Sequence, residues 1–153
     1  MRLSEQLDLL HTRVTGVGPL RLFTWMNRVL LSVGFLPSGL KKIVGEPFTL
    51  LGPETRVGYF FDAIHQAGWY YPFLGWAQVI AAVLLLVPRT ATLGALIYLP
   101  IILNIWVITV AMHFRGTWVI TSLMLLANLY LLCWDYDRLR GIFPWNDPAR
   151  VSG

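Results

Sequence analysis

The stretch TATLGALIYLPIILNIWVITVAMHF, residues 90–114, contains no Asp, Glu, Lys or Arg. Residues 116–134 form a second stretch without these residues, and residues 57–88 carry Asp62 as their only charge. Apolar runs of about 18 or more residues are typical of membrane spans. The composition agrees, because 56% of the 153 residues are hydrophobic and 13% are charged, against about 25% charged residues in soluble proteins. The sequence therefore predicts an integral membrane protein.

Four segments are long and apolar enough to be spans, so the predicted fold is all-α, a four-helix transmembrane bundle formed by residues 21–135. At about 1.5 Å per residue the segments extend roughly 26–32 Å, comparable to a hydrocarbon core of about 30 Å, so the shorter ones can cross it with little tilt. The expected spans are residues 22–40, 71–87, 92–112 and 117–134.

The long loop between the first two spans is expected to contain a short amphipathic helix. Apolar side chains recur there at helical spacing, and Pro53 and Gly68 are typical of a helix start and a helix end. The spaced residues are Val57, Phe60, Phe61 and Ile64. This helix would lie on the outer mouth of the bundle.

An even number of spans places both termini on one side of the membrane. Most arginines fall on that side, so residues 1–20 and 136–153 are expected to be cytoplasmic and the protein to reside in a bacterial inner membrane. The positive net charge of +4 follows from this topology and forms no basic patch, which argues against binding of nucleic acid.

Arg28 is expected about 10 Å inside the first span, where an isolated charge is costly. Asp135, at the end of the fourth span, is the predicted partner of a structural ion pair. Two interpretations stay open: a structural link or snorkelling arginine, or a site for an anionic head group or a quinone.

Residues 34–45, GFLPSGLKKIVG, place a proline, a hydroxyl and two cations where the first span ends. Pro37 frees the carbonyl of Val33, and such a bend in a membrane should face protein or water. We expect a polar, outward-facing pocket under the loop helix. Its predicted ligand-binding residues are Ser38, Lys42, Gln78 and His113, and Asn104 is added as a candidate from the third span. The alternative is a kinked helix end with snorkelling lysines, and an amide such as Asn104 can also simply bond across helices.

Several classes of site find no support in the sequence. Cys133 is the only cysteine, so a disulfide or a CxxC pair within the chain is excluded. The three histidines do not fall at ligand spacing on one helix, and no metal site is expected. A Ser–His–Asp set cannot be assembled.

The run RVLLSVGFLPSGLKKIVG, residues 28–45, resembles the opening signature of the DoxX family of four-helix membrane proteins. Residues 74–96, LGWAQVIAAVLLLVPRTATLGAL, are similar to the next family element, with Arg89 at the turn and Gln78 where the family usually has glutamate. The resemblance implies a link to thiosulfate:quinone oxidoreduction, to complexes that respond to oxidative stress, or to receptor assembly. An amide cannot accept a proton as a carboxylate does, so a mechanism that needs this glutamate is not expected here.

Two functions remain open. The first is binding of a small lipid-soluble or anionic molecule in the outward pocket, as a redox-associated, quinone-linked subunit; whether it is an enzyme stays undecided, and electrons would come from a partner protein or a diffusible substrate. The second is a non-enzymatic role as an assembly partner or as an oligomeric carrier. The expected partners are the lipid bilayer, a membrane or redox protein, and further copies of the chain.

Overall fold

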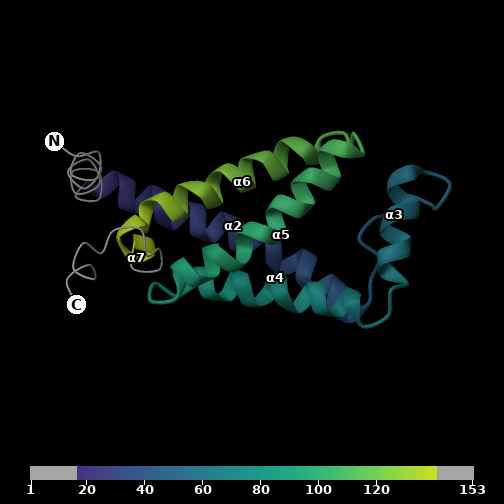
Figure 1. Cartoon of the computed structure of the whole chain (residues 1–153), viewed down its shortest axis with the longest axis horizontal. Coiled ribbons are helices and arrows are strands. Elements are labelled where there is room, and N and C mark those ends of the chain that lie inside the picture. Colours follow the sequence, from purple (N-terminus) through teal and green to yellow (C-terminus); the bar gives the residue numbers. More distant parts are fainter. Residues whose placement is uncertain (1–16, 141–153) are drawn as a thin grey trace, which may run out of the picture.

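The computed structural model describes residues 17–140, and these form an all-α structure without strands, as predicted. The helices are α2 (Gly18–Val44), α3 (Arg56–His65), α4 (Tyr70–Leu86), α5 (Ala91–Ala111), α6 (Thr117–Trp134) and α7 (Tyr136–Arg140) (Figure 1). Each expected span falls on one of the four long helices, and the expected loop helix is α3. The segments 1–20 and 136–153, predicted to be cytoplasmic, lie for the most part outside the described residues.

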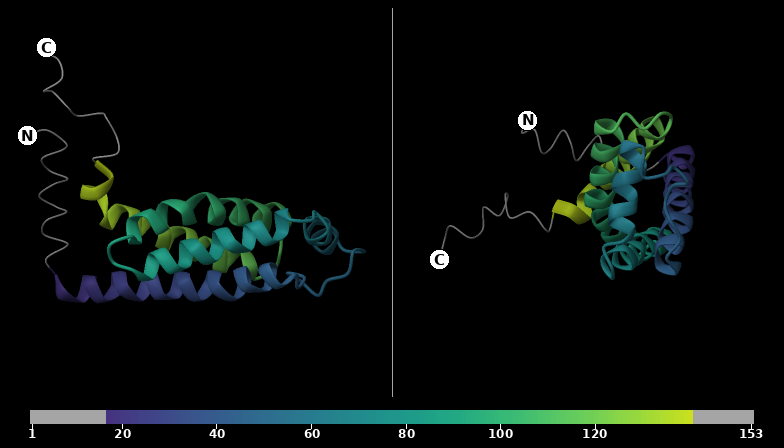
Figure 2. Two further views of the ribbon diagram at one scale, coloured as in Figure 1. Left: turned by 90° about the horizontal axis from the view of Figure 1, so that it is seen from below. Right: turned by 90° about the vertical axis from the view of Figure 1, so that its right-hand side faces the viewer.

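The four long helices form a bundle in which α2 and α5 each pack against both α4 and α6. Seen end-on, the helices surround a common core, and the start of α2 and the short α7 lie at the same end of the bundle (Figure 2). We call this the Arg28 end and the opposite end, where α2 stops and α3 begins, the Lys42 end. Successive long helices run in opposite directions because short turns join α4 to α5 and α5 to α6.

Small residues allow the helices of the core to approach closely. The core contains Ala81, Ala82 and Ala95 at 0% exposure, together with Phe35 and Tyr98, whose rings stack with centroids 3.6 Å apart. These alanines therefore allow close packing of helices within the chain.

The outside of the bundle is apolar, as expected for a protein surrounded by lipid. Leu30, Leu123 and Leu126 are all more than 60% exposed. By length and composition α5 and α6 can each cross a membrane, and α3 with α4 gives a third candidate span if this pair, bent by 92°, is counted as one. The 27 residues of α2 reach about 40 Å, although Asn27 and Arg28 lower its apolar character. The protein is thus an all-α membrane protein.

The first long helix continues past the end that the sequence suggests. Pro37 lies inside α2, which ends only at Val44, where Gly45 adopts a left-handed conformation (φ 85°) and its N–H bonds to the carbonyls of Lys41 and Lys42. A glycine in this conformation is a common helix terminator. Helix termination is therefore set by Gly45, and the two lysines occupy the last turn, where cations interact favourably with the helix dipole.

Pro37 is exposed and so does not pack inside the bundle; of its two expected surroundings, protein or water, water stays a prediction. The buried residues of α2 form one stripe at helical spacing, and Pro37 lies two residues from the buried Phe35, about 200° around the helix. The stripe consists of Thr24, Arg28, Leu31, Ser32, Phe35, Gly39 and Lys42. It thus carries one cation near each end of the bundle.

The short helix α3 lies across the Lys42 end, bent by 92° from α4. It begins at Arg56, three residues after the predicted Pro53, because the Thr55 hydroxyl accepts a 3.0 Å hydrogen bond from the N–H of Gly58. Threonine is a preferred residue at this capping position. The expected apolar side of α3 is half-buried.

Candidate functional site

Lys42 lies on the buried stripe of α2, one turn after Ser38. Its Nζ donates hydrogen bonds to the Ser38 hydroxyl at 2.7 Å and to the Ser38 carbonyl at 3.2 Å. After Gly45 the chain turns back, so that the ring of Phe48 lies 4.8 Å from Nζ. Residues four apart face each other on a helix, and an aromatic ring at this distance attracts a cation. These contacts hold the ammonium group at the end of the bundle.

The charge of Lys42 has no counter-ion in the part of the chain that the structure describes. The side chain is 8% exposed, and no carboxylate of residues 17–140 lies within 4.0 Å of it. Lys42 stands beyond the expected first span, and burial lowers its pKa to about 8. A buried cation without a partner is costly and attracts an anion.

Gln78 lies at the crossing of α2 and α4, the same crossing at which Lys42 packs. Gly39 and Gly75 meet at this crossing, and a Cβ on Gly75 would lie 2.9 Å from the Cβ of Lys42. One turn further along α4, the Cβ of Gln78 would lie 3.2 Å from a Cβ on Gly39. The Gln78 side chain is 2% exposed, and its Oε1 has no hydrogen-bond partner among the described residues. Ser38, Lys42 and Gln78 are therefore brought together at one helix crossing.

The other two predicted ligand-binding residues lie elsewhere. His113 is exposed in the turn between α5 and α6, with a φ of 53°. Asn104 is exposed on the outside of α5. Among residues 17–140 neither side chain hydrogen-bonds to Ser38, Lys42 or Gln78. The structure thus assembles three of the five candidates.

A cavity lies beside Lys42, between α3 and the loop that precedes it. It is small and open to the outside, and its walls include Phe48, Phe61 and Asp62. None of the five predicted residues lines it. The Phe48 ring connects the two features, because it faces Lys42 and also packs against Phe61 with ring centroids 4.5 Å apart.

Sequence reasoning missed the role of Phe48. A signal was present, because Gly45 and Pro47 form a turn after Lys42 that brings the following residue back toward the helix end. The sequence predicts Phe61 on the apolar side of the loop helix, but it does not predict the contact of Phe61 with Phe48.

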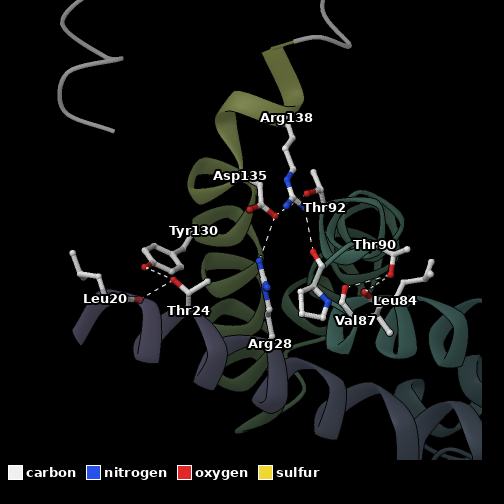
Figure 3. Close-up of polar contacts among 11 residues, drawn as sticks. Leu20, Thr24, Arg28, Leu84, Val87, Thr90, Thr92, Tyr130, Asp135 and Arg138 are labelled. Atoms are coloured by element: carbon white, nitrogen blue, oxygen red, sulfur yellow. Dashed lines mark hydrogen bonds and ion pairs between the residues drawn. The ribbon is translucent and has the colours of Figure 1, made fainter. Parts of the chain in front are cut away.

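At the opposite end of the bundle, Arg28 points toward Asp135, as Figure 3 shows. Arg28 Nη2 lies 3.5 Å from Asp135 Oδ2, and both side chains are 10% exposed. The Thr92 hydroxyl donates a 2.8 Å hydrogen bond to the same carboxylate oxygen. Asp135 therefore links α2, α5 and the end of α6. Beside it, Arg138 donates to the carbonyl of Pro88 at 3.2 Å.

Comparison with known proteins identifies the family of this chain. The model of the DoxX family matches residues 23–113, which is more than half of the chain. The chain belongs to the DoxX family. It is also 36% identical over 125 residues to the uncharacterized protein YwoB of Bacillus subtilis (strain 168), an alignment that covers 76% of this chain and 79% of that relative. No solved structure matches it.

The DoxX match covers α2 from residue 23 onward and all of α3, α4 and α5, and hence the whole Lys42 end apart from α6. Arg28 lies within the match, whereas its partner Asp135 lies beyond it. In this DoxX protein the three assembled candidates, Ser38, Lys42 and Gln78, come from the two helices that carry the family resemblance.

Proposed function

We propose that this DoxX protein binds a small amphipathic molecule at the Lys42 end of the bundle, with an anionic or carbonyl oxygen of the molecule on Lys42. The observation that carries the proposal is the buried Lys42 side chain without a counter-ion among the described residues. An ammonium group has three N–H donors, and Ser38 accepts two hydrogen bonds from Lys42. The remaining donor is available to a ligand.

The neighbouring cavity supports a ligand with an apolar part. Small-molecule sites combine mostly apolar walls with a few polar groups. Here Phe48 and Phe61 form an apolar wall, Asp62 adds a carboxylate, and Lys42 lies on the other side of the Phe48 ring. A quinone fits this description, because its carbonyl oxygens accept hydrogen bonds while its ring and tail are apolar. The finer form of the proposal is a quinone-linked, redox-associated membrane subunit.

Gln78 is the third element of the proposed site. Its Oε1 is buried and lacks a donor in the described chain, so a ligand hydroxyl, or a water bound with the ligand, would supply one. Burying such an atom without a partner is unfavourable, which favours a role in binding. The resemblance places a family glutamate here; in this chain the amide orients a ligand and does not take up its proton.

The proposal includes the topology of the chain. Four crossings, by α2, α4, α5 and α6, would place both ends of the chain in the cytoplasm of a bacterium and the Lys42 end outside the inner membrane. Arg21, Arg89 and Arg138 mark the Arg28 end, in keeping with the excess of arginine on the cytoplasmic side of membrane proteins. Reporter fusions at both termini and at the exposed Glu54 test this arrangement: the two terminal reporters should lie in the cytoplasm and the reporter at residue 54 outside.

Thermal unfolding of the full chain in lipid nanodiscs tests the ligand site. The seven tryptophans provide the fluorescence signal, and the probes are quinones of different tail lengths and a short-chain alkyl sulfate. A quinone or the sulfate should raise the Tm of the parent protein, and Lys42→Met should abolish that shift. Lys41→Met is the matched control, because Lys41 is the exposed neighbour, and it should retain the shift. If no probe shifts the Tm, or if Lys42→Met responds like the parent protein, the proposal is wrong.

A second candidate function is a non-enzymatic one, as an assembly partner or oligomeric carrier in a membrane complex. The exposed Asn104 amide on α5 favours it, because a polar group on a lipid-facing surface gains from a neighbouring protein helix. Chemical crosslinking in native membranes tests this candidate. Crosslinks to one other protein support an assembly role, and an exclusively monomeric chain argues against both the assembly partner and the oligomeric carrier.

A further inference from the structure

Asn104 differs from the other polar side chains of α5. This helix carries five of them, and four hydrogen-bond within the chain: Thr92 to Asp135, Tyr98 to the carbonyl of Leu31, Trp106 to Ser122, and Thr109 to Thr121. Asn104 is the fifth. It is exposed and makes no side-chain hydrogen bond to any residue of the described range 17–140.

The position of Asn104 along α5 keeps it away from water. The helix is long and apolar enough to cross a membrane, and Asn104 lies seven residues from its end at Ala111, or about 10 Å. The other end, Ala91, is about 20 Å away. Long lysine and arginine side chains can reach the interface from such depths, but the short amide of asparagine cannot. In the bilayer it must find a protein partner.

The surroundings of Asn104 form a continuous outward face of α5. Leu103 is 44% exposed and Val107 51% exposed, and Pro100 and Ala111 are also exposed at the same helical spacing. Pro100 has no N–H, so the carbonyl one turn before it lacks its usual helical donor. This face therefore combines apolar contact surface with an amide and a backbone carbonyl that lacks its usual helical donor.

We propose that this face of α5 is the contact between two copies of the chain in the membrane, with their Asn104 amides hydrogen-bonded to each other. An amide has both donors and an acceptor, so an identical amide across a two-fold axis satisfies it reciprocally. All copies insert in one orientation, so the axis is normal to the membrane and residue 104 of one copy meets residue 104 of the other. Asparagine side chains are known to join membrane helices in this manner.

The dimer deepens the second candidate function and is independent of the ligand site. The buried stripe of α2 and the cavity at α3 take no part in the contact, so loss of the dimer would leave binding at Lys42 intact, and loss of binding would leave the dimer intact. The two proposals can therefore fail separately.

Fluorescence energy transfer in liposomes measures the association of the full chain. The exposed Glu54 is replaced by cysteine in a Cys133→Ser background and labelled with donor and acceptor dyes, and transfer is followed over a series of protein-to-lipid ratios. Asn104→Leu should weaken the dimer by roughly tenfold, whereas Asn104→Gln, which keeps the amide, should preserve it. The matched control is Asn27→Leu, because the Asn27 amide already donates to the carbonyl of Phe23, and it should leave the association unchanged.

Disulfide crosslinking in membranes gives a second readout that does not depend on the Asn104 variants. In the Cys133→Ser background, Val107→Cys should crosslink two copies on oxidation, and Leu123→Cys on the 62% exposed outer face of α6 should not. Absence of energy transfer at every protein-to-lipid ratio, a dimer of Asn104→Leu as tight as the parent, or stronger crosslinking through residue 123 would each overturn the proposal.

Discussion

Gly39 and Gly75 face each other where α2 crosses α4, so closely that a Cβ on Gly75 would lie 2.6 Å from the carbonyl oxygen of Gly39. The obstacle is backbone, which cannot rotate away. At the same crossing Lys42 packs beside Gly75, and Gln78 packs beside Gly39. The geometry of the candidate site therefore depends on two residues that have no side chain.

Gly75→Ala should destabilise the bundle by about 1–3 kcal/mol, because it overpacks a contact that has no room. Thermal unfolding followed by circular dichroism in detergent measures the effect. Gly18→Ala is the control, because a Cβ there meets nothing within 4 Å, and its Tm should match that of the parent. A Gly75→Ala protein as stable as the parent would show that the two helices are further apart than described.

Asp135→Asn should destabilise the protein by roughly 3 kcal/mol, because it leaves the Arg28 guanidinium in its buried position without a charged partner. The asparagine oxygen still accepts from Thr92, so the loss reports the charge pair. The double variant Arg28→Met with Asp135→Leu removes both charges and should be the more stable of the two. Arg89→Gln, at an exposed position, should change the unfolding free energy little. A double variant less stable than Asp135→Asn would contradict this account.

Lys42 should titrate near pH 8. Burial lowers its pKa from 10.5 to about 8, so between these pH values the unfolded chain keeps a proton that the folded chain has released, and stability rises with pH across the window. The chain has two lysines, Lys41 and Lys42, and carbon-13 NMR of lysine-labelled protein resolves them. The signal that is missing in Lys42→Met should have its midpoint near pH 8.

A bound anion favours the charged form of Lys42 and should move the midpoint of this titration upward. A downward movement on ligand addition would argue against binding at this ammonium group.

Gln78→Met should raise the Tm of the ligand-free protein or leave it unchanged, while it reduces the Tm shift that a ligand produces. The reason is that methionine removes a buried oxygen without a hydrogen-bond partner and keeps a similar volume. Gln66→Met is the control, because Gln66 is exposed and donates to Asp62 on α3, and its ligand response should match the parent. A fall in the Tm of ligand-free Gln78→Met would indicate that the amide has a partner within the protein.

The sequence was sufficient to predict the membrane class, the helices and the proximity of Arg28 to Asp135. A charge inside an apolar segment is costly unless it is paired. The topology alone places Asp135 at the same end of the bundle as Arg28, so Asp135 is the expected partner. The helix α3 is predicted from the helical spacing of the apolar residues in the loop.

The faces of α5 could not be predicted from the sequence. This helix is apolar on all sides, so a periodicity of 3.6 residues does not distinguish its core face from its lipid face. The sequence therefore suggests Asn104 as a pocket residue, although it lies outside. The contact of Phe48 with Lys42 depends on the left-handed turn at Gly45, a tertiary feature that propensity does not encode. His113 was grouped with Lys42 because both lie at one end of the bundle, which does not bring their side chains together.

The helices that enclose the core are of unequal length. The 17 residues of α4 and the 18 of α6 extend about 26 and 27 Å, less than the thickness of an average hydrocarbon core. Such a hydrophobic mismatch is relieved when surrounding lipids compress or when flanking aromatic and cationic side chains extend toward the head groups. The protein should consequently favour thin bilayers, and short acyl chains should suit it better than long ones.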